Sequence, residues 1–197
     1  MDSLAHLFLF VGRPASGKET QGRLLSDKLN AELFMTGGRF REIIASGSPL
    51  GQRIKADYDS GKLMPAWVAV YLFQEFLFAL PDDEHAVFEG TGRALHEAEM
   101  FEATTKWLER PYTVFNLEVS EETVIKRSLA RARDAVDGSE EALRTRLEEY
   151  MHTTQPAIDY FTALGKCVTI DGEQPVEKIH EEVMSHVTCT PNHESKN

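Results

Sequence analysis

The chain has 197 residues, of which 42% are hydrophobic and 27% are charged, a balance typical of a folded globular domain and not of a disordered segment. Asp and Glu outnumber Lys and Arg by 32 to 21, and the formal net charge of −11 disfavours nucleic acid and anionic lipid as partners. Apolar stretches are short, and no basic segment precedes the apolar residues 4–11, so neither a membrane span nor a secretory signal is indicated. We therefore expect a cytoplasmic location, and we also expect a monomer.

Short apolar segments that end at glycine or turn residues alternate along the chain with longer segments of helical periodicity. The short segments are predicted to be buried strands at residues 6–11, 32–34, 86–88, 112–119 and 168–170. The longer ones are predicted to be helices at residues 18–29, 40–45, 49–58, 65–80, 94–108, 121–132, 140–164 and 175–184, with a turn at 36–38. This alternation predicts a three-layer α/β/α domain around a parallel five-stranded sheet at residues 1–188, with a disordered polar tail at 189–197.

Residues 12–18 (GRPASGK) fit the pattern GxxxxGK, directly after a predicted strand and before a predicted helix. In that context the loop turns its main-chain N–H groups toward a polyphosphate, the helix N-terminus adds the positive end of its dipole, and Lys18 adds a full charge. Thr20 is the nearest hydroxyl for the metal that accompanies the phosphates, since Glu19 follows the lysine directly. The alternative, a glycine-rich turn that binds nothing, is disfavoured by the strand before the loop and the helix after it.

Arginines gather at the predicted turns and helix ends of this otherwise acidic chain. They are Arg39, Arg41, Arg93, Arg127, Arg131, Arg133, Arg144 and Arg146. Phosphoryl transfer between nucleotides needs cations on both phosphate chains, Mg²⁺ on the donor and exclusion of water, so the set as a whole favours a phosphotransferase. Any single one of these arginines could instead form a surface salt bridge.

The motifs occur in an order that resembles the adenylate kinases, within the nucleoside monophosphate kinase family, from about residue 7 to residue 187. Residues 12–21 are similar to the family's GxPGxGKGTQ, 36–41 to TGDxxR, 61–65 to GxLVP, 89–93 to DGFPR, 146–160 to RLxxY…T.P…Y and 171–175 to DGxxP. The resemblance implies a P-loop NTPase fold with a helical nucleoside-monophosphate-binding part at about 36–65 and a short lid at about 132–139. It implies reversible phosphoryl transfer from MgATP to a nucleoside monophosphate, with AMP as the expected acceptor, and no structural zinc.

The resemblance also implies roles for the residues at matching positions. The residues implied to bind ATP are Gly12, Ala15, Ser16, Gly17, Lys18, Glu19, Thr20, Arg131 and Gln174. Those implied to bind the acceptor monophosphate are Thr36, Arg41, Leu63, Met64, Gly90, Arg93, Glu97, Arg133 and Arg146. Those implied to act in catalysis are Lys18, Arg41, Arg93, Arg127, Arg131, Arg133 and Arg146. Thr20, and Glu89 through water, are implied to contact Mg²⁺.

The chain departs from the family pattern at several of these positions. Ala15 stands in place of the loop's second glycine, and Glu19 in place of the glycine after the lysine. Both changes could weaken phosphate binding, although a glutamate on the first turn of a helix can point outward. Glu89 replaces the aspartate associated with magnesium-bound water, and Gly92 replaces the proline before the arginine.

Glu97 stands where adenylate kinases have a glutamine that accepts a hydrogen bond from adenine N6 and donates one to N1. An ionised carboxylate only accepts. Glu97 could therefore receive N1–H and N2–H of guanine, bind adenine N6 alone, or face solvent beside His96 and Glu99. The identity of the acceptor base stays open on this ground.

Three hypotheses follow for the function. The first is adenylate kinase activity, and the second is the same chemistry on another monophosphate such as GMP or CMP. The third is a nucleotide-binding interaction module that has lost catalysis. The retained Lys18, Arg41, Arg93 and Arg146 favour an enzyme, because binding alone needs no arginines around a second phosphate.

Overall fold

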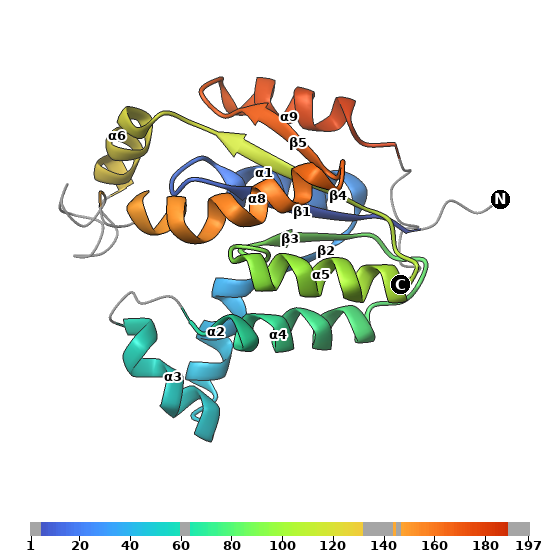
Figure 1. Ribbon diagram of the computed structural model, residues 1–197, viewed down its shortest axis with the longest axis vertical. Coiled ribbons are helices and arrows are strands. Elements are labelled where there is room, and N and C mark those ends of the chain that lie inside the picture. The colour runs from blue at the N-terminus through green and yellow to red at the C-terminus, as the bar shows by residue number, and fades with distance from the viewer. Residues whose placement is uncertain (1–4, 60–63, 132–143, 145–146, 189–197) are drawn as a thin grey trace.

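The computed structural model describes residues 5–59, 64–131, 144 and 147–188 (Figure 1). At its centre lies one sheet of five strands: β1 Leu7–Gly12, β2 Glu32–Met35, β3 Ala86–Glu89, β4 Tyr112–Glu118 and β5 Cys167–Asp171. The strands are hydrogen-bonded in the order β2-β3-β1-β4-β5, and every neighbouring pair is parallel. The predicted parallel five-stranded sheet is therefore confirmed.

Helices cover both faces of the sheet, as Figure 1 shows. The described helices are α1 Lys18–Leu29, α2 Thr36–Ala45, α3 Pro49–Asp59, α4 Ala66–Ala79, α5 Leu95–Trp107, α6 Glu121–Arg131, the π-helix η1 Tyr150–Thr154, α8 Gln155–Ala163 and α9 Val176–Ser185. On one face α1 and α9 form a core with Phe8 and Phe10 of β1. On the other face α4, α5 and α8 form a core with Leu7, Leu9 and Val11. The predicted three-layer α/β/α architecture is confirmed.

The central strand β1 belongs to both cores because its side chains alternate between the two faces of the sheet. Every residue from Leu7 to Val11 is at most 2% exposed, which explains the uninterrupted apolar sequence of a strand buried on both sides. Away from the sheet, α2 and α3 pack against each other and form the projecting helical pair in Figure 1. None of the described helices is long and apolar enough to cross a membrane.

One local prediction is wrong, and another needs refinement. Residues 36–38 do not form a turn but the first turn of α2, even though glycine costs about 1 kcal/mol per residue in a helix. Burial of Thr36 and Phe40 against the rest of the domain outweighs that cost. The helix predicted at 140–164 is helical in its described part, at residues 144 and 147–163, but its hydrogen bonding is π-helical over η1 before α8 begins. Pro156, near the start of α8, lacks the N–H that would bond to the carbonyl four residues back, and this interrupts the α-helical pattern.

Two histidines meet near the N-terminal end of the sheet. The main-chain N–H of His6 donates to Nδ1 of His85 at 2.7 Å, and Nε2 of His6 lies 2.9 Å from the Thr113 hydroxyl. Burial, together with the nearby His85 and Lys166, lowers the pKa of His6 to about 4. The folded protein therefore holds this imidazole in its neutral form well below the pH at which the unfolded chain would protonate it.

We predict a stability loss in acid that depends on His6. Because the pKa of His6 is lower in the folded state, His6 does not change the free energy of unfolding above pH 6.5. As the pH drops toward 4, protonation of His6 in the unfolded chain lowers the free energy of unfolding by about 2–3 kcal/mol. Urea unfolding at pH 7.5 and 4.5 should show that His6→Gln loses less stability on acidification than the native protein. The exposed His186→Gln is the control and should keep the native pH dependence. Equal pH dependence in all three proteins would contradict the prediction.

Candidate active site

Four of the predicted motifs directly follow strands: three begin at the ends of β1, β3 and β5 and continue into the loops there, and one lies in the first turns of α2 after β2. The strands of a parallel sheet all end at the same edge, which is where ligands bind in open α/β sheets. β1 lies between β3 and β4, with Phe10 opposite Glu89 and Gly12 opposite Leu117. The loop that begins after Gly12 therefore starts beside the loop that carries Arg93, and this edge is the candidate site.

Residues 12–17 form a tight loop whose shape depends on glycine. Gly12 has a φ of 132°, and a Cβ at this position would lie 2.4 Å from the main-chain oxygen of Leu117. Gly17, with a φ of 99°, is the N-cap residue of α1. The Lys18 ammonium folds back over the loop and donates to the main-chain oxygens of Gly12 at 2.9 Å and Arg13 at 2.7 Å. Main-chain groups, a helix N-terminus and a full positive charge thus meet at one place, as polyphosphate binding requires.

The two departures within this loop are accommodated differently. Ala15 has a φ of 55°, so the loop keeps a left-handed backbone that costs a non-glycine residue about 1–2 kcal/mol. Glu19 forms an ion pair with Arg23 at 3.1 Å, one turn further along α1, and both side chains are about half exposed (54% and 53%). The Glu19 carboxylate is therefore directed along the surface of α1 and not over the loop. Thr20 is exposed on the same first turn.

Arg127 of α6 links this loop to the segment after β5. Its guanidinium donates to the main-chain oxygen of Gly172 at 2.9 Å and to that of Ser16 at 3.5 Å. Gly172 is itself pressed against β4, since a Cβ there would lie 2.8 Å from the Glu118 oxygen. The predicted catalytic Arg127 therefore lies between two main-chain segments, one of which precedes the predicted ATP-binding Gln174.

Glu173 holds the same segment from its other side. Its carboxylate accepts from the main-chain N–H of Ser120 and from the Thr123 hydroxyl, both at 2.6 Å, at the beginning of α6. These hydrogen bonds lower the pKa of Glu173 to about 2, because they favour the ionised carboxylate. Gln174 in turn donates to Glu182 of α9 at 3.3 Å. Glu173 was not predicted from the sequence, where a single acidic residue in an acidic chain gives no signal.

The predicted acceptor residues Thr36, Gly90 and Arg93 come together at the end of β3. Gly90 has a φ of 83°, and a Cβ there would lie 3.2 Å from Cβ of Thr36 and 3.3 Å from Nη2 of Arg93. The Thr36 hydroxyl is 3.2 Å from that of Thr91, which is buried and was not among the predicted site residues. Glu89 lies 3.4 Å from the Arg93 guanidinium. A carboxylate, an arginine and a hydroxyl thus surround one glycine.

Arg41 and Met64 occupy other parts of the acceptor side. Arg41 donates to the hydroxyl of Tyr58 on α3 at 3.3 Å, so the α2–α3 helical pair holds this predicted phosphate ligand. Met64 packs at the edge of the core formed with α4 and α5. Tyr58 was not predicted, because no local pattern shows that α3 returns to α2.

Glu97 is buried, with 6% of its surface exposed, which excludes the possibility that it faces solvent beside Glu99. Its carboxylate turns back toward the loop before α5 and accepts from the main-chain N–H of Arg93 at 3.0 Å. Burial raises the pKa of Glu97, while main-chain N–H groups of residues 92–94 and the charge of Arg93 act in the opposite direction.

Comparison with known proteins adds a second line of argument. The model of the adenylate kinase family matches residues 10–166. An adenylate kinase of Corynebacterium urealyticum is 36% identical over 174 residues, which are 88% of this chain and 94% of that protein. An adenylate kinase of Cyanothece sp. is 33% identical over 183 residues (91% and 93%), and adenylate kinase 1 of Synechocystis sp. is 34% identical over 178 residues (90% and 94%). The chain belongs to the adenylate kinase family.

This family membership confirms the predicted enzyme class, a nucleoside monophosphate kinase, which is a phosphotransferase. The reaction of the family is phosphoryl transfer between ATP and AMP, with ATP as its magnesium complex. Some predicted site residues lie outside the described part of the chain: Leu63, Arg133, Arg146 and the lid at 132–139. Arg131 ends α6, but its side chain is likewise not described. These assignments stay predictions.

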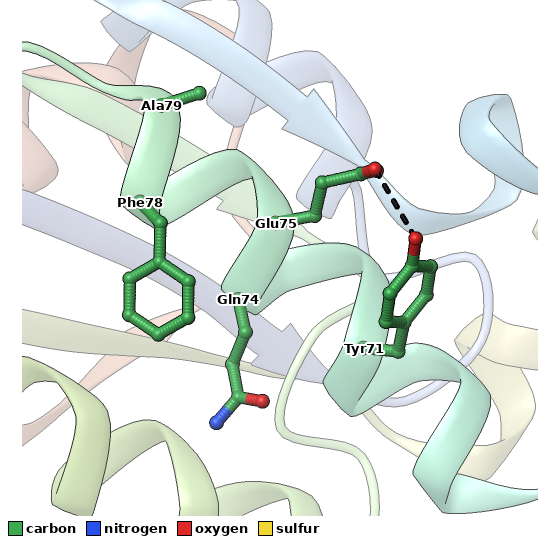
Figure 2. Close-up of a pocket in the computed structure, with 5 residues that line it drawn as sticks. All are labelled: Tyr71, Gln74, Glu75, Phe78 and Ala79. Atoms are coloured by element: carbon green, nitrogen blue, oxygen red, sulfur yellow. Dashed lines mark hydrogen bonds between the residues drawn. The ribbon is translucent and has the colours of Figure 1, made fainter.

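The hollow drawn in Figure 2 lies away from this edge of the sheet, on the exposed side of α4. It is lined by Tyr71, Gln74, Glu75, Phe78 and Ala79, with the Tyr71 hydroxyl donating to Glu75 at 3.3 Å. None of these lining residues is a cation, so this hollow lacks the chemistry for binding phosphate. The loops around Lys18 and Arg93 carry that chemistry.

We predict that Ala15→Gly stabilises the nucleotide-free protein by up to about 1 kcal/mol. Relief of the left-handed strain, about 1–2 kcal/mol, exceeds the entropic cost of glycine, about 0.5–1 kcal/mol. The control is Ala103→Gly on the exposed side of α5, which should destabilise by about 1 kcal/mol. Urea unfolding measures both free energies, and destabilisation by both variants would show that Ala15 carries no strain.

Proposed function

We propose that this chain is a cytoplasmic monomer that reversibly transfers the γ-phosphoryl group of MgATP to AMP, giving two ADP. The observation that carries the proposal is the adjacency of two anion-binding loops, one with Lys18 after β1 and one with Arg93 after β3. Because β1 and β3 are hydrogen-bonded neighbours, phosphates held by the two loops would lie side by side. Direct transfer between two nucleotides needs this arrangement.

On the donor side, the phosphate loop carries the Lys18 ammonium, which can change its hydrogen-bond partners while the loop keeps its fold. Lys18 can exchange its hydrogen bonds to the carbonyls of Gly12 and Arg13 for bonds to phosphate oxygens. Arg127 and Gly172 hold this loop and the segment of Gln174 in fixed relation. The proposed ATP-binding residues are Gly12, Ala15, Ser16, Gly17, Lys18, Glu19, Thr20, Arg131 and Gln174.

The residues proposed for Mg²⁺ offer oxygen atoms, the ligands that this ion prefers. Thr20 presents a hydroxyl on the exposed first turn of α1, and Glu89 presents a carboxylate at the end of β3 with 13% of its side chain exposed. Glu89 would act through water because it also pairs with Arg93. When bound, Mg²⁺ would neutralise part of the charge on the donor phosphates.

On the acceptor side, Arg41 and Arg93 would hold the monophosphate so that one of its oxygens faces the γ-phosphorus. A bond forms between that oxygen and phosphorus, and the bond from phosphorus to the β-phosphate oxygen breaks with its electron pair leaving on ADP. Both reacting oxygens belong to phosphates, so the arginines and Lys18 need to stabilise charge and not to move protons. The proposed acceptor residues are Thr36, Arg41, Leu63, Met64, Gly90, Arg93, Glu97, Arg133 and Arg146.

A substrate panel tests the proposal. With MgATP and AMP, GMP, CMP or UMP in turn, a coupled assay for ADP should give a kcat/KM for AMP that is at least about tenfold above the others. A higher kcat/KM for GMP than for AMP would show that GMP is the acceptor, as the carboxylate of Glu97 could suggest. Turnover with none of the four would contradict the proposed activity and leave a nucleotide-binding module.

Lys18→Ala should lower kcat by at least about a hundredfold, the effect of losing one charge partner of the transferred group. The fold should survive, since the carbonyls that Lys18 contacts in the loop can bind water instead. The exposed Lys28→Ala, at the other end of α1, is the control and should retain native activity. The test measures kcat and thermal unfolding for both variants. Near-native turnover of Lys18→Ala, or an unfolded Lys18→Ala protein, would contradict the role proposed for Lys18.

A further inference from the structure

Glu97, in the first turn of α5, bonds back to the loop that precedes the helix. Ala94 occupies the N-cap position and offers no side-chain acceptor, although the first N–H groups of a helix need partners. Glu97, the third residue of α5, folds back and accepts from the main-chain N–H of Arg93 at 3.0 Å. Burial raises the pKa of Glu97, and the main-chain N–H groups of Arg93, Gly92 and Ala94 act in the opposite direction. The buried carboxylate thus ties the first turn of α5 to the main chain of Arg93, an arrangement close to a capping box.

This part of the loop has a backbone that needs an anchor. Gly90 and Gly92 have φ angles of 83° and 73°, and glycine loses more conformational entropy on folding than any other residue. Proline, with its φ fixed near −65°, could not adopt the conformation of Gly92. The Arg93 guanidinium forms an ion pair with Glu89, but 47% of the Arg93 side chain is exposed to solvent, which weakens the pair. The hydrogen bond that fixes its main chain is therefore a second constraint on where Arg93 lies.

A base-reading role would compete with these bonds. One carboxylate oxygen of Glu97 already accepts from Arg93, and the neighbouring main-chain N–H groups favour the same ionised form. A nucleobase that took over this oxygen would deprive the part-buried N–H group of Arg93 of its acceptor. The geometry is thus better suited to holding the loop than to selecting a base.

We propose that Glu97 is a positioning residue, whose carboxylate fixes the main chain at Arg93 and thereby directs the Arg93 side chain toward the acceptor phosphate whichever base the acceptor carries. This inference rests on the proposed function, because it assigns Glu97 a role in placing that acceptor. It differs from the base-reading hypothesis, in which a change at Glu97 alters the preference among monophosphates.

The first test measures kcat and KM for ATP, AMP and GMP in three variants. Glu97→Ala removes the acceptor and should lower kcat/KM for AMP and GMP by the same factor, about 10–100-fold, with the KM for ATP unchanged. Glu97→Gln keeps a carbonyl oxygen that can accept the Arg93 N–H, and it should stay within about fivefold of native. The exposed Glu99→Ala on the same helix is the matched control and should behave as native. A shift of the AMP/GMP ratio by about tenfold or more in Glu97→Gln would overturn the proposal in favour of base reading.

The second test asks whether Glu97 acts through Arg93. If it does, Arg93→Ala combined with Glu97→Ala should be no slower than Arg93→Ala alone, whereas independent residues would give multiplied losses. Where Glu97→Ala does not fold, Glu97→Asp takes its place, since a carboxylate one methylene shorter cannot reach the same N–H. Multiplied losses would overturn the proposal.

A third measurement needs no catalysis and separates this inference from the proposed function. The main-chain amide N–H of Arg93 should exchange slowly with solvent in the native protein and in Glu97→Gln, and at least about tenfold faster in Glu97→Ala. This result would support the anchoring even if the native protein phosphorylated none of the monophosphates. Unchanged exchange in Glu97→Ala would overturn the anchoring itself, whatever the enzyme's substrate.

Discussion

The position of β1 at the centre of a parallel sheet is the constraint on which the rest of the structure depends. Its hydrogen bonds to β3 on one side and to β4 on the other leave no freedom in where its last residue lies. At Gly12 the chain passes so close to the Leu117 carbonyl that a side chain would not fit, and it must turn at once. Because β3 runs parallel to β1, the loop before α5 leaves the sheet beside this turn. The adjacency of the loops after β1 and β3 is thus a property of the sheet itself.

An acidic chain must gather its few cations to bind anionic nucleotides, and the contacts around α6 show how this is done. The Arg127 guanidinium donates hydrogen bonds to the main-chain oxygens of Ser16 and Gly172. These bonds connect the phosphate loop to the segment after β5. Glu173 fastens that segment to the beginning of α6 through Ser120 and Thr123. A carboxylate that accepts from main-chain N–H groups in this way holds a segment in place. Its negative charge is turned toward these N–H groups and not toward the phosphates. The net charge of −11 is therefore compatible with a strongly cationic edge of the sheet.

The parts of the fold that could be predicted are those with local signals. Strands buried on both faces are continuous apolar runs, and the phosphate loop has glycine and lysine at fixed spacing between a strand and a helix. The beginning of α2 could not be predicted, because Thr36 is buried beside Thr91, which is 55 residues further along the chain. The same reason explains why Tyr58, a partner of Arg41, and Glu173 were missed. In each of these cases a long-range contact outweighs the local preference, and one sequence contains no record of it.

The departures from the family pattern can be understood from the main-chain conformation that each position needs. The identity of the side chain alone does not explain them. The position of Ala15 requires a left-handed backbone, and that backbone persists at a φ of 55° although a methyl group has been added. Gly92 has a φ of 73°, so the loop there follows a path that proline would forbid. Along this path the main-chain N–H of the next residue, Arg93, donates to the Glu97 carboxylate at 3.0 Å. A carboxylate at position 97 and a glycine at position 92 are therefore physically connected, and neither is properly assessed by comparing its side chain alone with the family residue.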